Sequence, residues 1–421
     1  MKESQQVGAT KGSAVVANWA GNVEFSSVLE RPRSVAELQE LVARSAKVRV
    51  LGTGHSFNRI ADTTGTLLTV ADLPRVIDIG PNGVTVSAGL RYGEITAALQ
   101  AQGLALHNLG SLPHISVAGA CSTGTHGSGD ANGPLADAVN AITFVNAAGD
   151  LVTLTRDDPD FNGSIISLGA LGVTVSLTLD VQPAYELSQV VYDGLPVERL
   201  ATDFDAIMSS AYSVSAFTDW ADPEVMVWRK QKSPDFPAGW LGAKVADGPR
   251  HPIKAMPADH ATQQGGVAGP WNERLPHFRL EFTPSNGDEL QSEYFVPRAR
   301  AAEAVDVLRA LGNQFAEIIQ VSEVRTIAAD DLWLSPSQGR DTVALHFTWI
   351  QNEAAVRPVL VALEEALAPL DARPHWGKVF AADAVTLAER YPKVPDFIAL
   401  AARRDPDGKF RNDYLDTFLP A

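Results

Sequence analysis

The sequence is poor in cysteine and in long apolar runs. Cys121 is the only cysteine among 421 residues, so no internal disulfide and no cysteine-based zinc site can form, and we interpret it as a small packing residue. No stretch approaches the roughly 20 consecutive apolar residues that a membrane-spanning helix needs. Residues 1–21 also lack the apolar core of a signal peptide. We therefore expect a cytoplasmic protein without membrane insertion.

Positive charge is also scarce. The chain has 34 Lys and Arg against 50 Asp and Glu, which gives a formal net charge of −16, and no basic cluster stands out. Because such a surface repels a phosphate backbone, nucleic acid is not an expected partner. The nine histidines form no H-E-x-x-H motif and no close His/Asp cluster, so no metal site is predicted. A small uncharged or weakly anionic ligand in a local pocket is compatible with this acidic exterior.

The first 185 residues combine predicted helices and strands. Residues 34–46 place apolar side chains at helical spacing after Ser34, a candidate N-cap, and residues 47–51 then alternate like a strand. Further elements are predicted as a helix at 92–102 and as strands at 84–88, 141–146, 151–155 and 172–181, with a hairpin joining 141–146 to 151–155. We expect this α+β unit to be one domain, residues 1–185.

From residue 186 onward the segments become longer and less regular, which indicates a second domain at 186–370 and a C-terminal segment at 371–421. A polar stretch at 246–270 is interpreted as a long loop. The most informative elements of this part are predicted strands at 320–327 and 343–350 and predicted helices at 299–311 and 355–367. No internal repeat is visible.

A glycine-rich loop, LGTGHSFN at residues 51–58, directly follows a predicted strand. Glycines at 52 and 54 would let backbone N–H groups approach a pyrophosphate closely. A Rossmann site would need a third glycine where Phe57 stands and a helix after it, although Asp72 lies at about the position of a ribose-binding acid. We therefore disfavour the Rossmann interpretation.

A second loop, STGTHGSG at residues 122–129, is rich in Gly, Ser and Thr. Two such loops in one α+β domain supply the hydrogen-bond donors that a dinucleotide phosphate and an isoalloxazine ring require. This pairing draws attention to His55, which alone would more often be a surface or turn residue. A flexible hairpin is the alternative interpretation of the second loop.

Two predicted strands carry charged and polar side chains on one face. Glu323 and Arg325 are two residues apart, so they share a face with the apolar residues on either side of them. A charge pair among apolar residues must be satisfied by a partner or a ligand. In the strand at 343–350, His346 and Thr348 lie opposite an apolar face. The pattern favours a cleft, and a polar sheet face that merely meets solvent is the alternative.

Four separated motifs then occur in one order: GTGHSFN at 52–58, GSLPHISVAGACSTGTHGSG at 110–129, SLGALGVTVSLTL at 167–179 and HWGK at 375–378. Together they resemble the vanillyl-alcohol oxidase type of FAD proteins, and within that type the bacterial alditol oxidases. The resemblance covers essentially the whole chain. It implies an α+β protein with a PCMH-type FAD-binding domain and a substrate domain with a large antiparallel sheet flanked by helices.

The resemblance also implies how FAD would be held. In that family the histidine of the G-x-G-H-S loop is bonded to the flavin 8α-methyl group, and His55 is the matching position. Val173 matches a contact to the adenine half, and Gly110 matches the segment that would leave oxygen access to the ring. The other positions expected around the cofactor are Val50, Leu51, Gly52, Thr53, Gly54, Ser56, Ser111, Ser116, Gly119, Thr123, Gly124, Thr125, His126 and His375.

For the substrate, the resemblance implies Ser111, Glu323, Arg325 and Thr348 as partners of polyol hydroxyls, with His346 and Lys378 near the reacting end. We take Glu323, Arg325, His346 and Lys378 as the candidate catalytic residues. His346 is the favoured base because its reference pKa lies near neutrality, and Lys378 is assigned to the developing alkoxide.

The implied reaction converts the terminal alcohol of xylitol or sorbitol to the aldose and reduces O₂ to hydrogen peroxide, in a monomeric protein with covalent FAD. One alternative is a related aldonolactone or sugar oxidoreductase that uses another electron acceptor. A second alternative is a flavin- or sugar-binding protein without turnover, against which the complete reactive set argues.

Overall fold

The structure, a computed structural model, describes residues 16–254, 256–282 and 288–420. Its first unit contains a three-stranded parallel sheet in the order β3 (Leu29–Glu30), β5 (Thr66–Leu68) and β4 (Val48–Val50). Helix α1 (Val35–Arg44) joins β3 to β4, and the Ser34 side chain accepts a hydrogen bond from the backbone N–H of Glu37. The predicted N-cap, helix and following strand are therefore confirmed.

A five-stranded antiparallel sheet completes this unit. Its order is β10 (Leu151–Thr155), β9 (Val139–Val145), β11 (Val173–Leu179), β7 (Gly83–Ser87) and β6 (Ile77–Gly80). The predicted hairpin is confirmed as β9 and β10. Helices α2 (Tyr92–Ala101) and α3 (Val117–Thr123) pack into the same hydrophobic core. The first part of the second glycine-rich loop thus ends a helix and does not form a hairpin.

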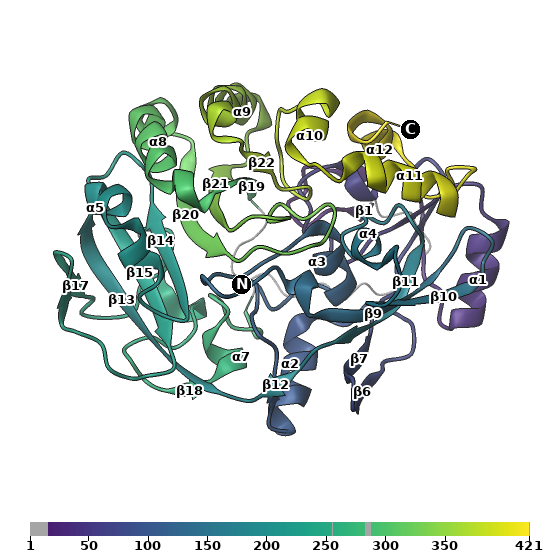
Figure 1. The fold of residues 1–421 in the computed structure, drawn as a ribbon, viewed down its shortest axis with the longest axis horizontal. Coiled ribbons are helices and arrows are strands. Elements are labelled where there is room, and N and C mark those ends of the chain that lie inside the picture. The colour runs from purple at the N-terminus through teal and green to yellow at the C-terminus, as the bar shows by residue number, and fades with distance from the viewer. Residues whose placement is uncertain (1–15, 255, 283–287, 421) are drawn as a thin grey trace.

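A ten-stranded antiparallel sheet dominates the second half of the chain, and Figure 1 shows it beside the first unit. Helices α5 (Val197–Thr202), α8 (Ala301–Phe315) and α9 (Glu353–Leu367) bury their apolar residues in one core with it. Its main strands are β13 (Glu186–Pro196), β15 (Glu224–Gln231), β14 (Ser213–Thr218), β20 (Ile319–Ile327), β21 (Thr342–Ile350), β19 (Glu289–Pro297) and β22 (Arg373–Pro374), in that order.

The chain end returns to the first unit. Helices α10 (Ala384–Arg390), α11 (Val394–Arg404) and α12 (Asp413–Phe418) contribute buried residues to the same core as α2 and α3. In addition, Val48 of β4 donates its backbone N–H to the carbonyl of Lys409 at 2.8 Å. Segments from the two ends of the sequence therefore close around the same unit (Figure 1).

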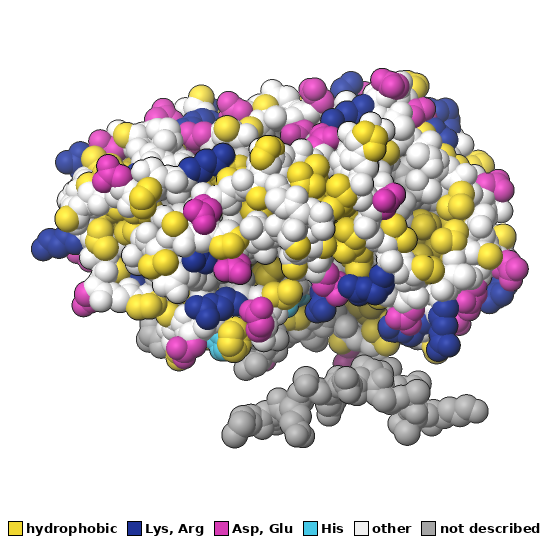
Figure 2. All heavy atoms as spheres, turned by 90° about the horizontal axis from the view of Figure 1, so that it is seen from below, with side chains coloured by type: hydrophobic (Ala, Val, Ile, Leu, Met, Phe, Trp, Pro, Cys, Tyr) yellow, Lys and Arg dark blue, Asp and Glu magenta, His cyan; other side chains and the backbone are white. Residues whose placement is uncertain are grey.

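Strands β20 and β21 confirm the predictions at 320–327 and 343–350, and α8 and α9 confirm the helices predicted near them. Within the described ranges, no helix is both long and apolar enough to cross a bilayer. The face seen in Figure 2 carries acidic and basic side chains interspersed.

Candidate active site

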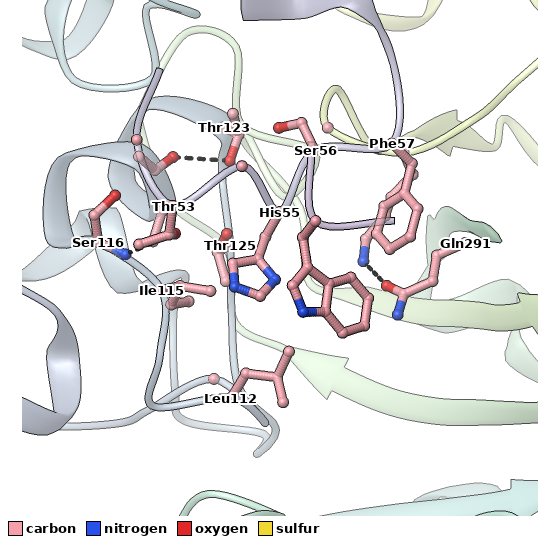
Figure 3. Close-up of a pocket in the computed structure, with 18 of the residues that line it drawn as sticks. Thr53, His55, Ser56, Phe57, Leu112, Ile115, Ser116, Thr123, Thr125 and Gln291 are labelled. Carbon is pink, nitrogen blue, oxygen red and sulfur yellow. Dashed lines mark hydrogen bonds between the residues drawn. The ribbon is translucent and has the colours of Figure 1, made fainter. Parts of the chain in front are cut away.

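A cavity of about 340 Å³ lies between the first unit and the large sheet. One side is lined by residues from the loop 50–58, the segment 110–126 and the C-terminal residues 375–378, and the other by β19, β20 and β21. Figure 3 shows His55 of the first loop beside Ile115 and Thr125 of the second segment. Both predicted glycine-rich loops therefore meet at one cavity.

The two glycine-rich segments pack closely against each other. The backbone N–H of Ser116, at the start of α3, donates to Oγ1 of Thr53 at 3.2 Å. Gly54 adopts a φ of +74°, in the left-handed region that favours glycine. A Cβ at Gly52 would lie 2.7 Å from Oγ of Ser116, so a larger residue would displace that hydroxyl. The loop can come this close because it carries glycine at both positions.

The second segment is also joined to the large sheet through the main chain. The backbone N–H of Gly129 donates to the carbonyl of Thr326 at 2.9 Å, and Gly129 forms a parallel bridge with Ile327 at the end of β20. Oγ of Ser128 donates to the carbonyl of Val214 in β14. The second loop and the strand that carries Glu323 and Arg325 are therefore held in fixed register.

His55 lies in the wall of the cavity, with its ring 5.1 Å from the Trp19 ring. Burial, with further contributions from Lys378 and His114, lowers the pKa of His55 to about 4. The imidazole is therefore neutral near pH 7 and keeps a nitrogen lone pair. In the described part of the chain neither of its ring nitrogens forms a hydrogen bond, so the side chain is available to a bound group. These features fit a histidine bonded to a cofactor.

The opposite wall is one face of the large sheet. Glu293 of β19 pairs with His346 of β21, which in turn pairs with Glu323 of β20, so these side chains form one row across the sheet. Gln291 and Thr348 form the adjacent pair. Phe347 and Trp349 point to the opposite face, where they are buried in the core beneath α8 and α9. The predicted division of the strand into a cleft face and a core face is confirmed.

Arg325 lies between two buried carboxylates. Its Nη2 is 2.7 Å from Oε1 of Glu293, and its Nε is 3.6 Å from Oε1 of Glu323. Burial alone would raise the pKa of both carboxyls. Arg325 and neighbouring histidines, His126 for Glu293 and His277 for Glu323, outweigh it and hold both pKa values well below the usual range. Both groups are therefore ionised and can accept hydrogen bonds from hydroxyls.

Gln291 connects the two residues predicted near the reacting end. Its Oε1 accepts a hydrogen bond from Nζ of Lys378 and lies 3.1 Å from Nε2 of His346. Because the ammonium form of Lys378 can only donate, the Gln291 atom that faces it is the oxygen, and His346 then carries its proton on Nε2. Nδ1 of His346 is left as an acceptor.

The pKa values of this pair are shifted by different amounts. Burial lowers the pKa of Lys378 to about 8, although Glu293 opposes the shift. Burial lowers the pKa of His346 to about 3, again against the charge of Glu293 and with the help of Lys378. Near neutral pH, His346 is therefore uncharged and Lys378 is the group that titrates.

Most positions singled out in the sequence line this cavity, and two do not. Val173 packs into the core with Val145, while its neighbours Gly172 and Thr174 reach the cavity wall. Gly124 is the left-handed C-cap of α3, with a φ of +76°, and likewise lies off the wall. Those found on the wall are Val50, Leu51, Gly52, Thr53, Gly54, His55, Ser56, Gly110, Ser111, Ser116, Gly119, Thr123, Thr125, His126, Glu323, Arg325, His346, Thr348, His375 and Lys378.

Sequence reasoning missed several polar residues of the wall. Glu289, Gln291 and Glu293 follow one another at every second position of β19, so alternation along residues 289–297 could have found them. His277 carried no such signal, because it lies in an irregular segment. Among the described residues, no group of three His, Cys, Asp or Glu side chains is arranged to hold a metal ion.

Comparison with known proteins agrees with this geometry. Residues 26–155 match the model of an FAD binding domain, and residues 287–418 match that of D-arabinono-1,4-lactone oxidase. An alditol oxidase from a Streptomyces species is 50% identical, covering 97% of this chain and 99% of that protein. An L-gulono-1,4-lactone dehydrogenase from Mycobacterium tuberculosis is 32% identical over the same shares of the two chains.

Solved structures show the same fold. A variant of cholesterol oxidase from Brevibacterium sterolicum superposes with a TM-score of 0.79 at 15% identity, covering 96% of this chain and 97% of that one. This likeness shows the fold alone, whereas the 50% identity over nearly the full length shows the family. The chain belongs to the alditol oxidases, FAD-dependent oxidoreductases of the vanillyl-alcohol oxidase type.

Proposed function

We propose that the protein oxidises the terminal primary alcohol of an alditol, such as xylitol or sorbitol, to the aldose and reduces O₂ to hydrogen peroxide. The observation that carries this proposal is a single cavity that has a glycine-rich cofactor wall on one side and a sheet face with Glu323, Arg325 and Thr348 on the other. The name of the 50% identical Streptomyces relative supports it.

The charged sheet face favours a polyol over an apolar alcohol. Two ionised carboxylates and the guanidinium of Arg325 offer acceptors and donors to adjacent hydroxyls. A ligand that lacked those hydroxyls would leave buried charged groups unpaired, and such sites reject the deficient analogue strongly. Ser111 and Thr348 add hydroxyl partners at the same cavity.

The chemistry that FAD would supply when bound is that of a hydride acceptor for the alcohol carbon and of an electron carrier to oxygen. We assign the loop at 50–56 to the diphosphate, and Ser116 and Gly119 at the start of α3 to the surroundings of the flavin. His55 would form the covalent bond through a ring nitrogen, which its neutral state and its lack of hydrogen-bond partners among the described residues support. Thr125, His126 and His375 would surround the ring system from the same wall.

The chain's own residues would handle the hydroxyl proton. Nδ1 of His346 can accept a hydrogen bond from the reacting hydroxyl and so orient it. The sequence favoured His346 as the base, and we now favour Lys378. A base works best when its pKa lies near the working pH, and burial brings the pKa of Lys378 to about 8. Gln291 holds the two side chains together.

The direct test is peroxide release. Stoichiometric hydrogen peroxide on addition of xylitol or sorbitol to the aerobic protein, together with bleaching of the flavin by the same polyols without oxygen, is the expected result. Bleaching without peroxide would favour the alternative, a dehydrogenase with another acceptor. That alternative is kept because the Mycobacterium relative is named as a lactone dehydrogenase, and L-gulono-1,4-lactone is therefore assayed in parallel.

Covalent attachment has its own test. Denatured and washed wild-type protein should stay yellow, whereas the His55→Ala protein should lose its colour under the same treatment. If both release the flavin completely, the bond is absent, and FAD binding itself is then judged from the native absorption spectrum.

We assign Gly110 to the path of oxygen. A Cβ built there would have its nearest neighbours at 3.5 Å (Cγ2 of Thr125) and 3.6 Å (Cδ1 of Ile115), which is ordinary van der Waals contact. The fold therefore tolerates Gly110→Ala, and a slower reoxidation of reduced flavin by oxygen in this variant would reflect the smaller cavity. Unchanged reoxidation would remove Gly110 from the path.

A further inference from the structure

A row of three buried side chains leads away from the cavity behind Glu323. Oε1 of Glu323 lies 2.7 Å from Nε2 of His277, and Nδ1 of the same ring lies 3.1 Å from Nζ of Lys230. All three side chains are buried, and Lys230 is only 1% exposed. Lys230 sits on β15, separated from β20 by the single strand β14. None of the reactions described above uses it.

The surroundings of Lys230 match an ammonium group. Nζ has three acceptors within hydrogen-bond distance: the carbonyl oxygens of Leu275 at 2.5 Å and Pro276 at 3.0 Å, and Nδ1 of His277 at 3.1 Å. An ammonium has three N–H donors and no acceptor, so the site satisfies it fully. A lysine charge is costly to bury, and removal from water without such partners would be strongly unfavourable.

This arrangement fixes the tautomer of His277. The ammonium form of Lys230 can only donate to Nδ1, so with that form the proton of the neutral ring must lie on Nε2, from which it is donated to Oε1 of Glu323. The opposite tautomer would face Lys230 with an N–H and Glu323 with a lone pair, and both contacts would be repulsive. Oε2 of Glu323 forms no hydrogen bond within the described part of the chain, which leaves it for a ligand in the cavity.

We propose that Lys230 is a positioning residue for the substrate site: through the tautomer of His277 it holds the Glu323 carboxylate in the orientation that binds a polyol hydroxyl. The inference rests on the proposed function for the identity of the ligand. The orientation itself depends only on contacts within the chain.

The packing of His277 supports this role. The centroid of its ring lies 5.2 Å from that of Trp228 and 5.6 Å from that of Phe217. Both contacts are edge-to-face, so the ring has little freedom to turn. Burial first, and then the charge of Lys230, lower the pKa of His277 to about 4 although Glu323 opposes the shift, so the ring is neutral at working pH and carries a single proton. Because the ring cannot turn and carries one proton, the hydrogen bond from Lys230 determines which ring nitrogen donates to the carboxylate.

The test compares four variants as holoenzyme: Lys230→Met, Glu323→Gln, the two combined, and Lys232→Met as a control. Lys232 is exposed and lies over the rings of Tyr185 and Tyr212, outside the cavity. Lys230→Met should raise KM for xylitol about ten-fold, the size expected for one weakened hydrogen bond to a charged group, with a much smaller effect on kcat. In the Glu323→Gln background the same change should have no further effect. Lys232→Met should match the wild type.

If the increases in KM caused by Lys230→Met and Glu323→Gln multiply in the double variant, the proposal is wrong. An unchanged KM in Lys230→Met would also overturn it. If Lys230→Met does not fold, His277 replaces it as the probe. His277→Gln keeps an N–H donor near the position of Nε2 and should retain most of the affinity that His277→Phe loses. Equal KM values in these two variants would also overturn it.

A second measurement is independent of turnover. In protein labelled with ¹⁵N-histidine, the His277 signals, assigned by their loss in His277→Gln, should report a protonated Nε2 and an unprotonated Nδ1, and in Lys230→Met a mixture of tautomers. Failure of the proposed function would appear as absence of polyol oxidation in the wild type. A wild-type ring with its proton on Nδ1 would overturn the relay whatever the substrate.

Discussion

The pH dependence of the reaction tests the electrostatics of the site most directly. If Lys378 must be neutral to accept the hydroxyl proton, kcat/KM should rise with pH through its pKa of about 8. With that value about one tenth of the side chain is neutral at pH 7 and about nine tenths at pH 9, so the expected increase is about ten-fold. His346, with its pKa lowered to about 3, does not titrate in this range.

Glu293 sets the pH at which kcat/KM rises, which we call the alkaline limb of the pH profile. Burial lowers the pKa of Lys378, and Glu293 is the largest influence that raises it. In Glu293→Gln the limb should therefore move to lower pH, by about one unit if the lost interaction is ~1.4 kcal/mol. The assay is peroxide release across pH 6 to 10 at several xylitol concentrations. Burial lowers the pKa of Lys230 to about 7, so Lys230→Met is measured alongside and should keep the limb near 8.

The opposite sign would refute this reasoning. If the ammonium form of Lys378 were needed, kcat/KM would fall through the same range, and Lys378→Arg, which stays charged, would remain active. An active Lys378→Arg without a limb, or a limb in Glu293→Gln at the wild-type position, would show that Lys378 is not the base.

Further expectations concern stability and geometry. Burial raises the pKa of Asp330 from its ordinary 3.8 to about 7, so this carboxyl lowers the stability of the fold progressively as the pH rises from about 4 to about 7. Asp330→Asn should therefore raise Tm relative to the wild type above pH 7, and this gain should vanish towards pH 4 in thermal melts. Gln291→Leu should separate Lys378 from His346 and lower kcat at least ten-fold while flavin content is unchanged. Asp130→Asn should weaken the bidentate pair with Arg298 and destabilise the protein by ~1 kcal/mol, as denaturant unfolding would show.

Sequence reasoning succeeded where a strand has two unlike faces. β21 puts His346 and Thr348 towards the cavity and large apolar residues towards α8 and α9, so its alternation revealed both the strand and the side that faces the cavity. β14 and most of β13 are buried on both faces, and no alternation marked them before the structure was known. The domain boundaries, the cytoplasmic location and the monomeric state remain predictions.

For the candidate site, local sequence patterns revealed some residues and tertiary packing determined the others. Glycine loops and the resemblance carried by four motifs led to His55 and to the polar pairs of β20 and β21. The contacts of Lys230 with His277, which are 47 positions apart in the sequence, arise only from tertiary packing. Val173 illustrates the opposite limit, because a motif match fixes a position in the chain but not the direction in which its side chain points.

The backbone bond from Gly129 to Thr326 has a consequence for how substrate preference can change. It ties the second glycine-rich loop to β20, the strand that we propose to bind the hydroxyls, without involving any side chain. Under the proposed function, residues on the cavity face of β20 and β21 could therefore be exchanged, and new alcohols admitted, while the alignment of the reacting carbon with the ring is kept. An insertion in β20 between Arg325 and Ile327 would do the reverse: every recognition residue would survive, and the alignment would be lost.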